Sequence, residues 1–311
     1  MKKNLTIATF ISNNEMYNDD LIKTIKYLES DYEIELIALS DKLIDNFDKN
    51  VRQVISKNTT KYKRIKKLIE ISTNSDILCL DNDITTNKRN LKEFIDYCFT
   101  IDYSIAWGKI KSIKVNSLTS HLVAIDKNLS HDYIRPLLWK CNVGISLPGQ
   151  IFMMNKNYYD EKLSCTDTVY DDLTIGVITK QNKMPIYFTK EVLGYEVPKI
   201  SLKALIAQRK RWAKGFAQTI YNNRETKMEK YVLLHGFVYH LLWLPVWIFF
   251  VFLFCINRLL FLIIFLLMCL ILSRGKFFDI LWSAMYIMIF PFIHSIWLLY
   301  FIFNLAKQYN E

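Results

Sequence analysis

The sequence lacks the cysteine spacing of either a zinc site or a secreted disulfide framework. Its six cysteines include no Cys-x-x-Cys pair, and two of them, Cys255 and Cys269, lie in a long apolar region. We therefore expect free thiols in a reducing compartment. No signal peptide is recognisable either, because the apolar run that follows Lys3 soon turns polar at Ser12.

Charged residues are almost missing from the C-terminal part of the chain. From Tyr231 onward the only ones are Arg258, Arg274, Lys276, Asp279, Lys307 and Glu311. Of the 40 Lys and Arg and the 30 Asp and Glu, 36 and 28 precede Tyr231, so +8 of the formal net charge of +10 lies in the first part. A polar, basic domain is thus followed by an apolar one, which implies two different solvents.

The apolar part predicts membrane helices. Tyr231–Ile256 and Phe277–Phe303 are each long enough to cross a bilayer, which needs about 20 apolar residues. Leu259–Leu272 is short for a span, and Pro291 is expected to kink the last helix. We expect three spans, because three crossings return the loop at Arg274 to the side of the basic domain, as the positive-inside rule prefers for the cytoplasm.

Ser201–Ile220 has the spacing of an amphipathic helix. Its apolar residues recur at helical intervals, and the opposite side is basic. This pattern is typical of a helix that lies at a membrane interface. The basic run from Lys199 to Lys230 stands directly before the apolar region, so we expect it to bind anionic membrane lipid.

The first part of the chain alternates between strand and helix patterns. Leu5–Ile11, Ile34–Leu39 and Asp76–Leu80 are short apolar runs typical of buried strands, and Tyr62–Ile71 has a helical stripe. Such alternation predicts an α/β domain with a mostly parallel sheet.

Acidic residues follow two of these strands. Asp41 comes directly after the second strand, and Asp81-Asn82-Asp83 follows the third. Ligands of parallel sheets bind beyond the carboxyl ends of the strands, so we expect both groups at one edge.

Asp81-Asn82-Asp83 places two carboxylates on either side of one residue. Such a pair suits a hard cation, since Mg²⁺ or Mn²⁺ is usually held by one or two carboxylates and by substrate phosphates. The cation would neutralise a diphosphate leaving group. Acidic triplets at strand ends are also typical of turns and helix caps, so the residues alone leave both interpretations open.

Asp171-Asp172 precedes a short helical pattern, Leu173–Lys180. The two carboxylates could complement the first turn of that helix. Alternatively, Asp172 could be a general base, because a buried carboxylate near another acid has a raised pKa and can accept a hydroxyl proton.

Gln208-Arg209-Lys210-Arg211-Trp212 is the most informative run. On a helix, Gln208, Arg211 and Trp212 share one face. A guanidinium suits phosphate oxygens, and an indole offers a flat surface to a sugar ring. An interfacial helix with a Trp anchor explains the same composition, but it does not explain the order.

This order resembles the Q(Q/R)xRW motif of family-2 glycosyltransferases of the cellulose, chitin and hyaluronan synthase kind, and ceramide glucosyltransferases carry a similar element. Asp81-Asn82-Asp83 resembles the DxD motif of that family, Asp171-Asp172 its (T)ED motif, and Asp41 stands where its first nucleotide-contacting Asp is found. The resemblance covers about residues 5–220.

The resemblance implies a GT-A fold, a nucleotide-sugar donor and a divalent metal. Asp41 would contact the nucleotide base, Asp81 the ribose or phosphates, and Asp83 together with Asp81 the metal. Asp172 would deprotonate the acceptor hydroxyl for inverting, in-line attack at the anomeric carbon. Pro148–Gly149–Gln150 stands where the family has a glycine-containing loop.

The same resemblance implies that Gln208, Arg211 and Trp212 line the site. Arg211 would hold the diphosphate and Trp212 the acceptor sugar. The chain departs from the family at two places: Asp41 lacks the Gly and Ser that usually follow, and residue 171 is Asp where Glu is usual.

We therefore expect three parts. Residues 1–200 would form the GT-A α/β domain, 201–230 the amphipathic interfacial helix with the Gln-Arg-Lys-Arg-Trp run, and 231–311 a transmembrane region of three helices. The protein would be a multi-pass component of the cell membrane with its catalytic domain in the cytoplasm.

The expected function is metal-dependent, inverting transfer of a sugar from a nucleotide-diphosphate sugar, with UDP-sugar favoured, to a glycan or lipid-linked acceptor. Polysaccharide synthase and single-transfer glycolipid synthase stay open. Three spans are too few for an export channel from one chain, so a polymerase would need a homo-oligomer or an export partner. A non-catalytic membrane scaffold is the alternative, although the intact carboxylates argue against it. No nucleic-acid motif is recognisable, so we expect no nucleic-acid partner.

Overall fold

The computed structural model describes residues 2–11, 18–44, 51–57, 59–113, 115, 117–163, 168–198 and 201–310. The chain divides into two compact units, of which the first comprises Met1–Lys111 and Gly144–Val197. The second comprises Ser112–Val143 and Pro198–Glu311, so an internal segment groups with the C-terminal part. The three parts expected from the sequence, 1–200, 201–230 and 231–311, place residues 112–143 in the first part and not with the C-terminal region.

The first unit is built on an eight-stranded sheet in the order β3-β2-β1-β4-β7-β6-β8-β5. The strands are β1 Lys3–Ile11, β2 Tyr32–Ser40, β3 Val51–Ile55, β4 Asp76–Asp81, β5 Ile84–Thr86, β6 Ile105–Ser112, β7 Ile151–Asn155 and β8 Ile186–Glu196. β3, β2, β1 and β4 run parallel, whereas β7 is antiparallel to both β4 and β6, and β5 is antiparallel to β8. The sheet is therefore mixed, and the predicted parallel arrangement holds for its N-terminal half.

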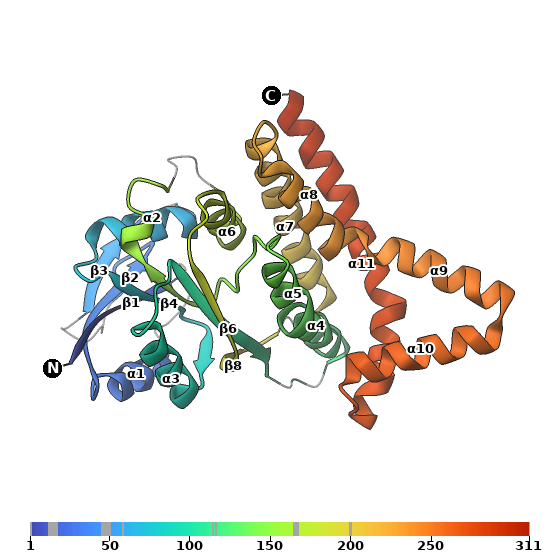
Figure 1. The fold of residues 1–311 in the computed structure, drawn as a ribbon, viewed down its shortest axis with the longest axis horizontal. Coiled ribbons are helices and arrows are strands. Elements are labelled where there is room, and N and C mark those ends of the chain that lie inside the picture. Colours follow the sequence, from blue (N-terminus) through green and yellow to red (C-terminus); the bar gives the residue numbers. More distant parts are fainter. Residues whose placement is uncertain are drawn as a thin grey trace. The chain divides into compact units, whose positions relative to one another are not determined.

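Helices connect β1 to β2 and β3 to β4 (Figure 1). In the first unit these elements are α1 Asp19–Leu28, α2 Lys61–Ile71, α3 Lys88–Cys98, the 3-10 turn η2 Lys156–Tyr158 and α6 Asp171–Gln181. Central strand residues such as Leu5, Ile7 and Leu78 are fully buried together with Leu91 of α3. The predicted strands at β1, β2 and β4 and the predicted helices at α2 and α6 are confirmed.

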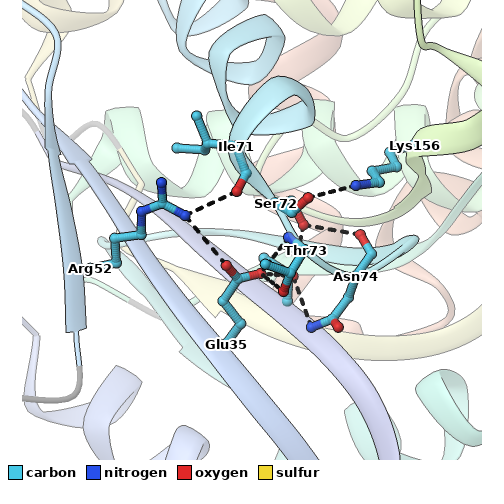
Figure 2. A network of polar contacts seen from close by, with 8 residues as sticks. Glu35, Arg52, Ile71, Ser72, Thr73, Asn74 and Lys156 are labelled. Carbon is cyan, nitrogen blue, oxygen red and sulfur yellow. Dashed lines mark hydrogen bonds and ion pairs between the residues drawn. The ribbon is translucent and has the colours of Figure 1, made fainter.

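A polar network joins β1, β2 and β3 to the turn before β4 (Figure 2). Oε2 of Glu35 accepts hydrogen bonds from the hydroxyl of Thr6 at 2.7 Å and from both the backbone N–H and the hydroxyl of Thr73 at 2.9 Å. Arg52 lies 3.7 Å from the other carboxylate oxygen and donates to the carbonyl of Ile71 at 3.0 Å. One carboxylate on β2 thus connects β1, β3 and the end of α2.

The described part of the second unit is helical. It contains α4 Leu118–Leu129, the π-helical turn η1 Ser130–Ile134, α5 Arg135–Lys140, α7 Leu202–Asn223, α8 Glu229–Gly236, the π-helical turn η3 Phe237–Leu241, α9 Trp243–Ile256, α10 Arg258–Ser273 and α11 Phe277–Asn310. α7 packs along α11, and α9 and α10 form a hairpin beside α11 (Figure 1). Ser201 caps the predicted amphipathic helix by accepting a hydrogen bond from the N–H of Ala204 at 3.2 Å. That prediction is confirmed.

Within the described residues, α11 is the one helix that is long and apolar enough to cross a membrane by itself. A second candidate is formed if α8 and η3 are joined to α9, across a bend of 42°. α10 is apolar but shorter, and Pro291 lies inside α11. The three spans expected from the sequence therefore stay a prediction.

Candidate active site

Two predicted acidic positions meet at one edge of the sheet in the first unit. Asp81 is the last residue of β4 and is in register with Phe10 of β1, while Ile11 of β1 is in register with Ser40, the last residue of β2. Asp41 follows directly. The carboxyl ends of three parallel strands thus lie together, as expected, and they place Asp41 and Asp81 along one rim.

The middle residue of the Asp81-Asn82-Asp83 triplet holds the turn in place. Asn82 is only 4% exposed, and its side-chain oxygen accepts a hydrogen bond from the N–H of Asn18 at 3.0 Å. The side chain of Asn18 returns a bond to the carbonyl of Asn82 at 2.9 Å and also caps α1. Asp81 is partly buried and Asp83 is exposed. The two hydrogen bonds between Asn18 and Asn82 thus fix the turn without using the carboxylate of Asp81 or of Asp83.

Lys61, at the start of α2, joins the two acidic motifs. Its ammonium donates to Oδ1 of Asp81 at 2.5 Å and to the carbonyl of Gly149 at 2.7 Å. It also lies 4.0 Å from a carboxylate oxygen of Asp171. Asp81 and Asp171 are 90 residues apart in the sequence. One cation brings them into the same site.

Electrostatics at this site favour a charged lysine among several acids. Burial lowers the pKa of Lys61, but the charges of Asp81 and Asp171 outweigh that effect and raise it above its ordinary value. Burial raises the pKa of Asp81 to about 7, against the attraction of Lys61 and with the repulsion of Asp83 and Asp171. Lys61 therefore stays protonated, and the excess of carboxylates gives the site an affinity for further positive charge.

The loop before β7 sets the position of α6. The carbonyl of Gln150 accepts the backbone N–H of Asp81 at 2.9 Å, and a Cβ atom added to Gly149 would lie 3.3 Å from Cβ of Asp172. That spacing is tighter than an ordinary side-chain contact, so Gly149 lets the start of α6 approach the loop closely. Asp171 and Asp172 occupy the first turn of α6, where the helix dipole favours negative charge.

Asp41 is held by an arginine from the same helix that supplies Lys61. A terminal nitrogen of Arg64 lies 2.7 Å from Oδ1 of Asp41, and the other donates to the carbonyl of Ile11 at 3.1 Å. Arg64 is 6% exposed. In this structure the carboxylate of Asp41 forms an ion pair with Arg64. The predicted contact of Asp41 with a nucleotide base stays a prediction.

Sequence reasoning missed Lys61 and Arg64, although the sequence carries a signal for them. The helical spacing places Lys61 and Arg64 on the same side of α2 as the buried residues Ile65 and Leu68. The two basic side chains therefore interrupt an apolar stripe. A basic residue on a buried stripe needs an acidic partner. The strand-end aspartates are the available partners.

The remaining predicted site residues, Gln208, Arg211 and Trp212, belong to α7 in the second unit. Gln208 and Trp212 are partly buried and Arg211 is exposed. The predicted helix that carries them is confirmed, whereas their roles beside the carboxylates of the first unit stay predictions.

Arg209, within the same run, is buried and anchors α7 to two other helices. Its guanidinium donates to Oδ2 of Asp126 on α4 at 2.6 Å, and Oδ1 of Asp126 accepts the hydroxyl of Tyr286 on α11 at 2.9 Å. The guanidinium also lies 4.3 Å from the ring centre of Trp212 and 5.6 Å from that of Phe290. This contact, which we call the Arg209 clamp, fixes the position of the indole from within the second unit.

The acidic edge fits a divalent cation of a particular kind. Among the residues that the structure describes, no group of three or more His, Cys, Asp or Glu side chains is arranged to hold a metal ion. Asp81 and Asp83 can supply one or two hard oxygen ligands, which suits Mg²⁺ or Mn²⁺ when substrate phosphates and water complete the coordination.

Comparisons with known proteins identify the family of the chain. A sequence model of glycosyl transferase family group 2 matches residues 77–306, which is more than half of the chain. The chain therefore belongs to glycosyl transferase family group 2 and is a glycosyltransferase. A search of curated protein sequences found no match.

Solved structures share the fold at low sequence identity. The mannosyltransferase PcManGT from Pyrobaculum calidifontis, in complex with GDP-Man and Mn²⁺, has a TM-score of 0.50 and 12% identity, covering 78% of this chain and 71% of its own. S. aureus TarS 1-349, in complex with UDP-GlcNAc, has a TM-score of 0.51 and 12% identity, covering 76% and 73%. The likeness supports a GT-A-like α/β fold, as expected from the sequence.

Proposed function

We propose that this glycosyltransferase moves a sugar from a nucleotide-diphosphate sugar, with a UDP-sugar favoured, to a lipid-linked or glycan acceptor at the cytoplasmic membrane face. The observation that carries the proposal is the convergence of Asp81 and Asp171 on Lys61, at the sheet edge where ligands of parallel strands bind. Both solved relatives named above hold a nucleotide-sugar.

In the proposed reaction, Asp81 and Asp83 would hold Mg²⁺ or Mn²⁺, and the ion would supply positive charge to the diphosphate leaving group. Asp172 accepts the proton of the acceptor hydroxyl as its oxygen attacks the anomeric carbon. The new glycosidic bond forms while the bond to the diphosphate breaks, and in-line geometry inverts the anomeric centre. Lys61 keeps Asp81 and the start of α6 together throughout.

The second unit supports a membrane location. Along α9, α10 and α11 many large apolar side chains are exposed, among them Phe252 at 59%, Ile263 at 48% and Leu299 at 69%. Exposed apolar surface of this extent is unfavourable in water and favourable in a bilayer. We infer a multi-pass protein that places its acceptor site at the membrane surface, where Gln208, Arg211 and Trp212 would bind diphosphate and sugar.

The first experiment measures release of nucleoside diphosphate by membranes or detergent-purified protein with a panel of UDP- and GDP-sugars. We expect release with one donor in Mn²⁺ or Mg²⁺ and none after chelation of the metal. Release that persists in excess EDTA would exclude the proposed metal role.

Asp172→Asn tests the general base. Because an amide cannot accept the proton, we expect transfer to fall by at least about 100-fold, the contribution typical of general-base catalysis. Binding of the donor, followed by equilibrium dialysis, is expected to persist. Asp160→Asn, at an exposed position of the same unit, is the matched control. Normal turnover by Asp172→Asn would refute the assignment.

Sizing the product on a gel with a radiolabelled donor separates a polymerase from a single-transfer enzyme. A ladder of lengths indicates repeated transfer, whereas one product indicates a glycolipid synthase. The small number of candidate spans among the described residues favours single transfer, because an export channel for a polymer needs more helices.

A further inference from the structure

The end of β8 is paired with the residue that follows the acidic triplet Asp81-Asn82-Asp83. That residue, Ile84, is the first of β5 and is in register with Glu196, the last residue of β8. The first unit ends one residue later, at Val197. Strand ends at such a border open easily unless side chains hold them. Glu196 has no role in the proposed transfer reaction as described so far.

A side-chain hydrogen bond holds this strand end. The amide of Gln150 donates to Oε2 of Glu196 at 2.9 Å, and both side chains are partly buried. A hydrogen bond to a carboxylate is stronger than one between neutral groups, and partial burial limits competition from water. The bond therefore joins the end of β8 to the loop that precedes β7.

The same loop residue is bonded to the triplet through its main chain. The carbonyl of Gln150 accepts the backbone N–H of Asp81 at 2.9 Å. The triplet thus lies in a ring of three links, which run from Asp81 to Gln150, from Gln150 to Glu196, and from Glu196 to Ile84. The first and last links are made by the backbone. The middle link depends on the two side chains, so it is the one that the sequence controls.

Gly194 allows this ring to close. A Cβ atom added to Gly194 would lie 2.6 Å from Cδ1 of Ile151, the first residue of β7, and 2.9 Å from Cγ2 of Ile84. Any side chain at this position would push β8 away from both strands. Glu196 is two residues further along β8 and so lies on the same face as Gly194. The close approach brings its carboxylate within reach of Gln150, directly before β7.

The ring holds the two ends of the triplet, whereas Asn18 holds its middle through the hydrogen bonds with Asn82. With the middle fixed, the spacing of the carboxylates of Asp81 and Asp83 depends on how the ends are held. Mg²⁺ requires nearly ideal octahedral geometry, so this spacing decides how well two carboxylates can share one ion. Neighbours that orient metal ligands in this way commonly set the affinity of a site.

We propose that Glu196 is a positioning residue for the metal-binding carboxylates. Through Gln150 it holds the Asp81 end of the triplet, and through its pairing with Ile84 it holds the Asp83 end. Glu196 acts on the ion only through these neighbours. The inference rests on the proposed metal role of Asp81 and Asp83, and it adds an acid that none of the sequence motifs includes.

The test measures metal binding without turnover. Full-length protein in detergent is titrated with Mn²⁺, in separate series with UDP and with GDP, and free Mn²⁺ is followed by electron paramagnetic resonance. Glu196→Leu removes the acceptor of the Gln150 amide but keeps the backbone pairing with Ile84. We expect the dissociation constant for Mn²⁺ to rise about tenfold, as is typical when a residue that orients metal ligands is lost.

Conservative and paired variants distinguish positioning from general damage. Glu196→Gln keeps a side-chain oxygen for the Gln150 amide, so we expect Mn²⁺ binding close to that of the wild type. Gln150→Leu breaks the same bond from the other side and should weaken binding as much as Glu196→Leu. The double variant should bind no more weakly than either single variant, because both side chains act through one bond. Glu191→Leu is the matched control, since Glu191 is exposed on the same strand.

Equal Mn²⁺ affinity of Glu196→Leu and the wild type would overturn the inference, as would losses that add in the double variant. Asp83→Asn separates this result from a failure of the metal role. If Asp83→Asn abolishes the Mn²⁺ binding of the wild type but Glu196→Leu leaves it unchanged, only the role of Glu196 is refuted. A wild type that binds no Mn²⁺ in either series would refute the metal role and, with it, this inference.

Discussion

At the scale of single residues, Lys61 is the group on which the acidic site depends. Three oxygen-bearing groups lie around its ammonium, the carboxylates of Asp81 and Asp171 and the carbonyl of Gly149, and the two carboxylates come from motifs far apart in the sequence. A lysine in this position has two effects. It offsets the repulsion between Asp81 and Asp171, and it holds the start of α6, which carries Asp172, against the end of β4.

Lys61→Met preserves the length of the side chain but removes its charge. Because Asp81 and Asp171 then repel each other without compensation, we expect kcat/KM to fall by about 100-fold, equivalent to about 2.7 kcal/mol. Initial rates of nucleoside diphosphate release at varied donor concentration measure it.

Lys63→Met is the control for that measurement, since Lys63 is exposed on the same helix. Equal kinetics for the two variants would show that Lys61 has no special role. A loss seen only in Lys61→Met at unchanged melting temperature supports the role described.

The sequence predicts the acids of this site better than the bases. Asp41 and Asp81 follow short apolar runs typical of buried strands, and the place of both residues at a sheet edge follows from strand polarity. Lys61 and Arg64 lie on a helix whose position over the edge depends on tertiary packing. Their partners become evident only when β1, β2 and β4 are assembled.

At the scale of elements, some strands are predicted by the sequence and others are not. β1, β2 and β4 are mostly buried and have continuous apolar runs, so the sequence predicts them. β8 has mostly half-buried or exposed residues, and β5 has three residues. Neither has a clear period, because their conformation is fixed by pairing with each other and with the rest of the sheet.

The Glu35 network gives a pH-dependent contribution to the joining of β1, β2 and β3. Burial raises the pKa of Glu35, but hydrogen bonds from Thr6 and Thr73 and the charge of Arg52 outweigh it, so the pKa lies below its ordinary value. The folded state therefore binds this proton less readily than the unfolded state. The stabilisation is present above the unfolded pKa and is lost as pH falls through the folded pKa.

Glu35→Gln is accordingly expected to destabilise the protein by about 2 kcal/mol at pH 7, where three hydrogen bonds to a charged oxygen are weakened. The difference from wild type should shrink as pH falls from about 6 to 3, in the range of the unfolded Glu pKa. Thermal melts across that range measure the difference. A difference that is constant with pH would contradict the network as described.

The Arg209 clamp permits a second prediction at this scale. Arg209→Met leaves Asp126 partly buried without its cation, so we expect a loss of about 3 kcal/mol in the free energy of unfolding. The double variant Arg209→Met/Asp126→Asn removes both charges and keeps a side-chain oxygen for the hydroxyl of Tyr286, so it should recover most of that stability, because no unpaired charge stays partly buried.

The activity of the double variant then shows whether Arg209 only stabilises the second unit or also positions Trp212 for the acceptor. If the guanidinium holds Trp212 for the acceptor, the acceptor KM stays raised in the stable double variant while the donor KM is unchanged. Full recovery of both constants would mean that Arg209 acts on stability alone. Glu225→Leu, at an exposed side chain of the same unit, is a control for the change in charge.

At the scale of the whole molecule, the chain combines two kinds of surface. The first unit buries its apolar side chains around a sheet, whereas α9, α10 and α11 expose theirs. The sequence predicts this contrast from charge distribution, because charged residues are nearly missing after Tyr231. The number of crossings stays a prediction, since α10 is short, as its sequence already indicates, and a bend of 42° separates η3 from α9.

A charged residue on the exposed face of α10 distinguishes water from lipid around these helices. Leu266 is 46% exposed, so Leu266→Arg would be nearly neutral in water. In a bilayer, a central arginine costs about 3 kcal/mol, and we expect the carbonate-resistant fraction of the protein to fall by more than tenfold. Leu137→Arg is the matched control, because Leu137 of α5 is 60% exposed but lies outside the apolar helices. Equal membrane retention of the two variants would place α10 in water and refute the membrane location.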